Sequence, residues 1–487
     1  MNYKMMLSIL GRVLLIEAVL MICPMLVGVI YQENNFTAFL YPVLGLTAIG
    51  FVLSLIKIKD RAMYAKEGFV VVAIAWLCMS AVGALPFVIN GEIPNYIDAF
   101  FETVSGFTTT GATILSGEQL EGMSKALMFW RMFTHWIGGM GVLVFVLAIV
   151  PGYNAGVMHV FRAEAPGPSV GKLVSKLTHT ARILYGIYIV MTIVQVIFLL
   201  CGGNSFYNSV LLSFSTAGTG GFSMYASSAA DFSLYTQMVL AVFMFLFGVN
   251  FNVYYLILIG SVSKVFRSEE LRMYFIVVLV ATLSIAINIL SIFGNFGLAI
   301  SHAFFQVSSI TSTTGLTTAD FDAWPDFSRA VLLLLTIIGA CGGSTGGGIK
   351  FSRLGILIKS CASDVKRMIH PRAVVSTKFE GETLDEQTIR NSKSYLLLWL
   401  LIVILSTLLL SLDYQGTAQY DGLFTNFSAT LACMGNVGPG FAGVGPMCSY
   451  AMYSPISKIV LSLVMLIGRL EIFPILILFS PRTWRRV

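Results

Sequence analysis

Four segments of the chain share one pattern of glycine and hydroxyl-bearing residues. They read DAFFETVSGFTTTGAT at residues 98–113, NSVLLSFSTAGTGGFS at 208–223, HAFFQVSSITSTTGLT at 302–317 and TNFSATLACMGNVGPG at 425–440. The first and third agree at 8 of 16 positions, and all four place glycine at one register: Gly111, Gly221, Gly315 and Gly438. Each glycine follows an apolar stretch of about three helical turns. Each segment is therefore predicted to be a short helix that ends in a glycine loop.

Such loops can coordinate a cation with uncharged oxygen atoms. Glycine tolerates positive φ, so a loop built on it can turn its carbonyl groups toward a common axis. A ring of carbonyls, supplemented by threonine hydroxyls, can replace the water shell of a cation. Helices that end at the ring direct their partially negative C-termini at it. The predicted filter residues are Thr109, Thr110, Gly111, Thr219, Gly220, Gly221, Thr313, Thr314, Gly315, Asn436, Val437 and Gly438.

The register is open in two of the four segments. In the second, Gly218, Gly220 and Gly221 are all candidates, and Gly221 is preferred because Phe222-Ser223 then aligns with Leu316-Thr317. In the fourth, Gly435 is an alternative to Gly438. Small residues that only let helices pack closely are the competing interpretation, which four loops in one register disfavour.

The elements that must position these loops are membrane helices. Hydrophobic residues make up 56% of the 487 positions and charged residues 11%, whereas soluble domains carry about 25% charged residues. This composition excludes a soluble, disordered or nucleic-acid-binding chain. Spanning helices are expected at 5–30, 38–56, 68–90, 124–150, 182–202, 232–260, 272–294, 329–358, 394–413 and 456–480. The short apolar stretches before the four glycines suit re-entrant segments, because a full crossing needs about 20 residues.

Basic residues gather at one side of this arrangement. The N-terminal region, the segment 359–393 and the C-terminal Arg482, Arg485 and Arg486 fall on that side, and the other side carries mainly acids. The positive-inside rule then predicts that both termini are cytoplasmic.

The repeat predicts an all-α polytopic membrane protein with four pseudo-fourfold helix–pore loop–helix units and two extra N-terminal helices. The expected boundaries are 1–66 for the extra helices, 67–161 for the first repeat, 162–265 for the second, 266–390 for the third and 391–487 for the fourth. A repeat of this kind defines architecture more firmly than local propensity does.

A candidate gate lies in the third repeat. Residues 339–348 hold six glycines in ten positions, and each glycine inside a helix costs about 1 kcal/mol relative to alanine. A flexible intramembrane loop below the filter is therefore expected, with close helix packing as the alternative. Arg469 is expected to face the pore and set an electrostatic barrier, or else to be a structural arginine bound to half-helix carbonyls. The candidate gate residues are Gly342, Gly343, Ser344, Thr345, Gly346, Gly347, Lys350 and Arg469.

Together these motifs resemble the Trk/Ktr/HKT superfamily of potassium transporters, most closely the bacterial Trk membrane subunit of the Trk-H and Trk-G kind. The resemblance rests on the four loops, on GACGGSTGGGIK at 339–350 and on GRLEIFP at 468–474. It implies potassium uptake across the bacterial inner membrane, potassium being the only metal and bound at the filter. In that family a serine at the first filter glycine accompanies sodium permeation, so four glycines favour potassium. The resemblance also implies a homodimer and a cytosolic regulatory subunit that binds NAD and ATP-type nucleotides.

Two other classes of function are weighed against this one. An ion-coupled secondary transporter of an organic solute also uses broken helices, but such proteins usually carry inverted repeats, and here the repeats are parallel. No catalytic motif is present, so the chain is not expected to be an enzyme. The run GGSTGGGIK lacks the order of a phosphate loop, so no cofactor is expected on this chain and any nucleotide would bind only the partner subunit.

Overall fold

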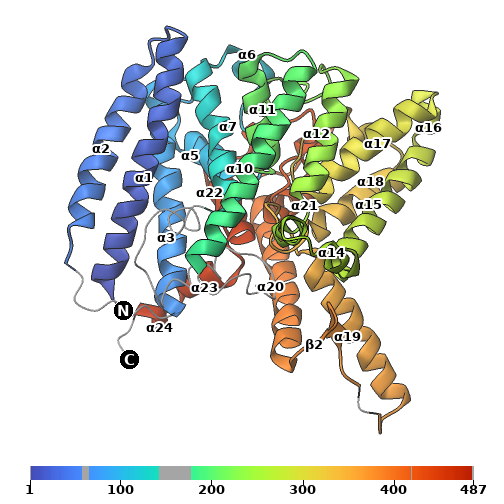
Figure 1. The fold of residues 1–487 in the computed structure, drawn as a ribbon. Helices are drawn as coiled ribbons and strands as arrows, with labels where there is room; N and C mark the ends of the chain where they lie inside the picture. Colours follow the sequence, from blue (N-terminus) through green and yellow to red (C-terminus); the bar gives the residue numbers. More distant parts are fainter. Residues whose placement is uncertain (1, 58–64, 142–176, 374, 418, 485–487) are drawn as a thin grey trace.

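The computed structural model describes residues 2–57, 65–141, 177–373, 375–417 and 419–484, which form an all-α bundle (Figure 1). The chain is a polytopic membrane protein. Six of its described helical segments are long and apolar enough to cross a membrane, namely Tyr3–Ile30, Phe36–Ser54, Lys66–Ile89, Ala181–Cys201, Glu269–Asn288 and Glu386–Ser411. The pair Leu234–Phe247 and Phe251–Leu258, bent by 89°, is a seventh if it is counted as one span.

The first two helices form a hairpin at one edge of the bundle (Figure 1). They are α1 (Tyr3–Ile30) and α2 (Phe36–Ser54). A Cβ built on Gly11 would lie 2.8 Å from the carbonyl oxygen of Gly50, and one built on Gly50 would lie 2.8 Å from that of Gly11. The two glycines therefore let the helix backbones cross in close contact.

The rest of the chain follows one plan four times: an outer helix, a half-helix with its loop, and an inner helix. The first unit contains α3 (Ala65–Gly83), α4 (Leu85–Ile89), α5 (Tyr96–Phe107), α6 (Gly117–Gly122) and α7 (Lys125–Gly139), and the second contains α10 (Leu177–Cys201), α11 (Phe206–Ala217), α12 (Leu234–Phe247), α13 (Phe251–Leu258) and α14 (Val262–Arg267). The third contains α15 (Glu269–Asn288), α16 (Leu290–Phe293), α17 (Phe296–Thr311), η1 (Phe321–Ala323), α18 (Asp326–Ile338) and α19 (Phe351–Ile369). The fourth contains α20 (Glu386–Ser411), α21 (Gly422–Gly435), η2 (Ala442–Val444), η3 (Tyr450–Met452), α22 (Pro455–Arg469), α23 (Phe473–Phe479) and α24 (Pro481–Trp484). A two-stranded hairpin of β1 (Lys378–Phe379) and β2 (Glu382–Thr383) joins the third unit to the fourth.

Each half-helix begins at a residue that caps it. The N-cap side chains of α5, α11, α17 and α21 are Asn95, Ser205, Asn295 and Asp421, and each accepts a hydrogen bond from a backbone N–H of the first turn. Such a cap stabilises a helix by about 1 kcal/mol. The four caps fix where each re-entrant segment turns back into the bundle.

Three of the inner helices are interrupted within the described residues, and two of the expected continuous spans, 232–260 and 456–480, are wrong. The expected helix 232–260 is two helices bent by 89° between Phe247 and Phe251. The expected helix 329–358 is split by a non-helical stretch at 339–350, as the glycine content indicated, and 456–480 is split between Arg469 and Phe473. In the first unit α7 ends at Gly139, and residues 142–150 of the expected helix 124–150 lie outside the described ranges. Asn250, whose side chain accepts from the N–H of Asn252, begins the second half of the bent pair.

Candidate functional site

The four glycine loops meet and close into a ring. A Cβ built on Gly111 would lie within 3.0 Å of the carbonyl oxygen of Gly220, one on Gly221 would meet that of Thr314, and one on Gly315 would meet that of Val437. One on Gly438 would lie 2.6 Å from the carbonyl oxygen of Thr110, which returns to the first loop. Each register glycine therefore lies against the carbonyl of the next repeat, so a side chain at any of the four would collide with that neighbour.

The loop backbone has the same conformation in all four repeats. Gly111, Gly221, Gly315 and Gly438 have φ of 82°, 79°, 85° and 95°. The residue two positions earlier is also left-handed, with φ of 53° at Thr109, 54° at Thr219, 61° at Thr313 and 53° at Asn436. Non-glycine residues rarely adopt this region, so its recurrence marks a constrained turn. This common conformation selects Gly221 over Gly218 and Gly220, and Gly438 over the helical Gly435.

Side-chain hydrogen bonds also stabilise the loops of the ring. The hydroxyl of Thr110 lies 2.7 Å from that of Thr108 and accepts a hydrogen bond of 2.9 Å from Asn436 Nδ2. Asn436 Nδ2 also donates to the carbonyl of Met465 on α22, at 3.0 Å. In the third loop, the hydroxyls of Ser312 and Thr314 are 2.7 Å apart. The first and fourth loops are thus joined through side chains as well as through the backbone.

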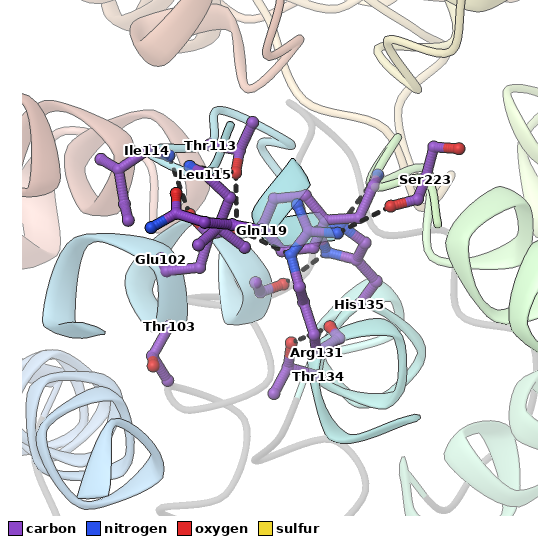
Figure 2. A network of polar contacts seen from close by, with 12 residues as sticks. Glu102, Thr103, Thr113, Ile114, Leu115, Gln119, Arg131, Thr134, His135 and Ser223 are labelled. Atoms are coloured by element: carbon purple, nitrogen blue, oxygen red, sulfur yellow. Dashed lines mark hydrogen bonds and ion pairs between the residues drawn. The ribbon is translucent and has the colours of Figure 1, made fainter. Parts of the chain in front are cut away.

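A buried ion pair lies against the segment that follows Gly111 in the first loop, as Figure 2 shows. Glu102 of α5 and Arg131 of α7 are 2.7 Å apart, with side chains 0% and 2% exposed. Glu102 accepts from the hydroxyl of Thr113 at 2.9 Å and from the N–H of Ile114 at 3.0 Å. Arg131 donates to the carbonyl of Ser223 at 3.0 Å. The pair therefore ties the segments that follow Gly111 and Gly221 to each other.

His135 joins the same two repeats one turn further along α7 (Figure 2). Its Nδ1 lies 2.7 Å from the carbonyl of Gly106, and its Nε2 lies 3.3 Å from the N–H of Phe222. Both contacts are satisfied by a neutral ring that donates from Nδ1 and accepts at Nε2. A Cβ on Gly220 would collide with this imidazole, which explains why that loop position is also glycine.

A cavity of about 300 Å³ opens on the α6 side of the ring. Its wall contains all four register glycines and, beyond them, Thr113, Ser223, Thr317 and Tyr450. The hydroxyl of Tyr450 donates to the carbonyl of Gly438 at 2.8 Å. The cavity is therefore a vestibule, lined partly by polar groups, that leads to the ring.

The glycine-rich stretch 339–350 lies on the other side of the ring. The N–H of Gly347 donates to the hydroxyl of Thr313 at 2.7 Å. A Cβ on Gly346 would lie 2.6 Å from the carbonyl of Ser312, and one on Gly347 would lie 2.6 Å from that of Gly435. The loop thus packs under the ends of half-helices α17 and α21, next to the ring itself.

Arg469, the last residue of α22, binds this loop and the end of α7. Its guanidinium donates to the carbonyl of Thr345 at 2.6 Å and to those of Gly138 and Gly139 at 2.5 Å each. These acceptors are inner-helix and loop carbonyls, whereas the structural alternative expected half-helix carbonyls. Lys350 donates to the carbonyl of Gly346. The charged groups of the candidate gate are thus bound to backbone oxygen atoms of the glycine-rich stretch and of the end of α7.

The comparisons with known proteins agree on one family. The family model described as "TrkH: Cation transport protein" matches residues 46–486. The chain belongs to the TrkH family. A Trk system potassium uptake protein TrkH of Escherichia coli K12 is 34% identical over 495 residues, covering 100% of both chains. A TrkG of the same organism is 31% identical over 472 residues, covering 96% of this chain and 95% of its own. The crystal structure of the potassium transporter TrkH from Vibrio parahaemolyticus matches with a TM-score of 0.87 at 30% identity, covering 100% of both chains.

Membership of the TrkH family confirms the resemblance that the four loops and the two motifs indicated, and it confirms the all-α membrane fold. The relatives are transport proteins, so this chain is not an enzyme. The structure brings together all twelve expected filter residues, and it places the glycine loop and Arg469 beside them. It adds Glu102, Arg131 and His135, which sequence reasoning missed. The available signal was a glutamate, an arginine and a histidine inside apolar half-helix or inner-helix segments, where polar groups are expensive unless they are paired.

Proposed function

We propose that this TrkH-family protein takes up potassium through the ring formed by its four glycine loops. The closed ring is the observation that carries the proposal. Four backbone carbonyl oxygens, those of Thr110, Gly220, Thr314 and Val437, each lie against the register glycine of a neighbouring repeat, just beyond the ends of the four half-helices. No carboxylate lies in the loop positions. Such a set suits a monovalent cation that must be held and then released. The potassium uptake named for the relatives supports the same substrate.

The ring also favours this proposal over an organic-solute transporter. Transporters of that kind bind substrate between two inverted halves, whereas here the four repeats run in parallel around one site. Glycine at all four register positions accords with potassium selectivity over sodium.

The stretch 339–350 acts as the gate in this proposal. It lies directly under the ring, and its contacts with Thr313 and Arg469 join it to the filter and to an inner helix. Opening requires the loop to move away from the axis. Its glycines and its contact with the long side chain of Arg469 permit this movement. Arg469 holds the closed position by donating to carbonyls of the loop and of the end of α7.

The cellular arrangement follows from charge and from the relatives. We expect a bacterial inner membrane location with both termini cytoplasmic, because the basic segments share the end at which α1 begins and α24 lies (Figure 1). Repeat boundaries at 67–161, 162–265, 266–390 and 391–487 are retained. A homodimer and a cytosolic regulatory subunit carrying an NAD or ATP-type nucleotide are the proposed assembly, with α19 and residues 370–393 as the exposed surface for the subunit.

The test is rubidium uptake into proteoliposomes under an imposed membrane potential, with potassium and sodium as competitors. Potassium should compete and sodium should not. Deleting residues 341–347 should raise basal uptake, because the obstruction is removed. Gly122→Ala is the matched control, because Gly122 lies in α6 near the vestibule and a Cβ there meets nothing within 4 Å. Uptake that sodium and potassium inhibit equally would contradict the selective ring.

A further inference from the structure

The glycine loop is fastened at a second place, away from the ring, by a carboxylate at the start of α15. Glu270 is 6% exposed. Its Oε1 accepts from the N–H of Gly342 at 2.7 Å and from the N–H of Ser352 at 2.9 Å. These two amides lie on either side of the loop's central glycines. A single carboxylate oxygen therefore bridges the entry and the exit of the loop, with charge-assisted hydrogen bonds that are stronger than neutral ones.

The same place also fixes the loop to the bend between α12 and α13. The N–H of Cys341 donates to the carbonyl of Gly248 at 3.1 Å, and the N–H of Phe251 donates to the carbonyl of Gly343 at 3.0 Å. Asn250 Nδ2 lies 3.5 Å from Glu270 Oε2. Glu270 is thus the charged member of a latch that holds residues 341–343.

The position of Glu270 is set by a second glutamate, in the turn of the β1–β2 hairpin. Glu380 Oε1 accepts from the backbone N–H of Glu270 at 2.8 Å and from the hydroxyl of Ser268 at 3.0 Å. It therefore caps the first turn of α15, where free N–H groups and the helix dipole favour an anion. The two glutamates act in series, because Glu380 holds the backbone of the residue whose side chain holds the loop.

The turn has an unusual residue at this point. Glu380 and Gly381 have φ of 51° and 80°, and the two-residue turns that need positive φ at both positions favour Asn-Gly or Gly-Gly. A glutamate there is conformationally unfavourable, and such outliers gather at functional sites. The turn alone does not explain a glutamate here, whereas the hydrogen bonds that its carboxylate accepts at the start of α15 do.

The hairpin also touches the helix that leaves the loop. Phe379 is 6% exposed, and a Cβ on Gly355 of α19 would lie 2.6 Å from its ring and 3.2 Å from Met273 Sδ of α15. Lys359 of α19 forms an ion pair with Glu269 of α15. Phe379 is therefore wedged between α15 and α19, so a displacement of the hairpin would shift both flanks of the latch.

We propose that the β1–β2 hairpin, residues 378–383, controls the gate. Through Glu380 and Glu270 the hairpin holds the glycine loop in its obstructing position. Displacing the hairpin releases the loop. This inference rests on the proposed gate. It makes Glu270 and Glu380 positioning residues, since neither touches the ring. It also makes the exposed side of the hairpin, with Lys378 and Thr383, the place where a cytosolic protein would act.

The experiment measures basal rubidium uptake of the full chain in proteoliposomes, without any partner protein. Glu380→Ala should raise basal uptake roughly tenfold, the change expected when a hydrogen bond to a charged group is lost. Glu380→Gln keeps an acceptor oxygen and should give a smaller rise. The matched control is Glu382→Ala, which removes an exposed carboxylate from the same hairpin and should leave uptake unchanged.

Selectivity separates release of the gate from general loosening. Because the ring is untouched, competition by potassium and sodium should be the same in Glu380→Ala as in the wild type. A rise in uptake accompanied by lost selectivity would overturn the proposal. In the protein lacking residues 341–347, Glu380→Ala should add nothing, because there is no loop left to release.

The same set of variants separates the latch from the gate. If the shortened protein conducts like the wild type, the gate itself is refuted. If the shortened protein conducts faster while Glu380→Ala and Glu382→Ala behave alike, the gate stands and the latch is refuted.

Discussion

The ion pair of Glu102 and Arg131 gives a prediction whose size follows from the geometry. Glu102→Gln keeps the shape of the side chain and an acceptor for Ile114, but it leaves the charge of Arg131 without its carboxylate. Arg131 donates to the carbonyl of Ser223 at 3.0 Å. Ser223 is two residues from Gly221, which is at most about 7 Å of chain. The guanidinium therefore lies within about 10 Å of the ring.

An unneutralised positive charge at that distance opposes a cation in the ring. With an effective dielectric constant of about 20, the repulsion is about 1.7 kcal/mol, which corresponds to a roughly 15- to 20-fold loss of occupancy. The rubidium concentration that half-saturates uptake should therefore rise by about that factor. Stability should also fall, since removing one partner of a buried pair costs about 3–5 kcal/mol. Thermal unfolding in detergent checks this second effect.

Two further variants make the reasoning refutable. The double variant Glu102→Gln with Arg131→Met removes both charges and should restore most of the affinity for rubidium. Asp98→Asn is the matched control, because it breaks an ion pair with Lys458 at the start of the same half-helix, 2.6 Å in length, further from the ring. Unchanged half-saturation in a folded Glu102→Gln protein, or a double variant as weak as the single one, would show that the charge of Arg131 does not reach the site.

Three other outcomes are expected. Gly221→Ala should lower uptake about 100-fold or more, because its Cβ would collide with the carbonyl of Thr314 and φ there is positive. Rubidium flux measures this loss. Arg469→Ala should raise the conduction rate of single open pores, because three carbonyl bonds and one positive charge are lost together, and an unchanged rate in bilayer recordings would contradict a barrier. The pKa of Asp413 lies below its ordinary value because the hydroxyl of Ser457 and the N–H of Ser454 donate hydrogen bonds to its carboxylate. A carboxyl with a lowered pKa stabilises the fold above its unfolded pKa, and this contribution is lost as the pH falls through the folded pKa. The difference in thermal stability between wild type and Asp413→Asn should therefore shrink as the medium becomes more acidic than about pH 4.

The ring of glycine loops could be predicted from the sequence because it depends on a local pattern. Glycine at a fixed register after an apolar half-helix is visible in the letters, and the backbone requirement at Gly111 or Gly315 is met by that residue type alone. The split at 339–350 was predictable for the same reason, since six glycines disfavour a helix by more free energy than helix packing commonly contributes. The composition was enough to predict a membrane fold.

The bend at Gly248–Asn250 and the paired charges could not be predicted in this way. Residues 232–260 contain two asparagines, Asn250 and Asn252, shortly after Gly248. The bend is held by the carbonyl of Gly248, which accepts a hydrogen bond from the N–H of Cys341, a residue 93 positions away. Glu102 and Arg131 likewise lie on different helices. Their partnership depends on how α5 and α7 pack, which neither segment specifies alone. Glu270 and Glu380 are 110 positions apart and meet only once the hairpin lies against α15.

The ring is built by one polypeptide, and this changes what a single mutation can do. In a pore made from four identical subunits, every substitution appears four times around the axis. Here Gly111, Gly221, Gly315 and Gly438 belong to one polypeptide, so each can be substituted without changing the other three. Glu102, the partner of Arg131, is an example of such a difference between repeats. The positions that align with it in the other three repeats are Leu212, Gln306 and Ala429. A substitution can thus change one sector of the ring while the other three keep their contacts.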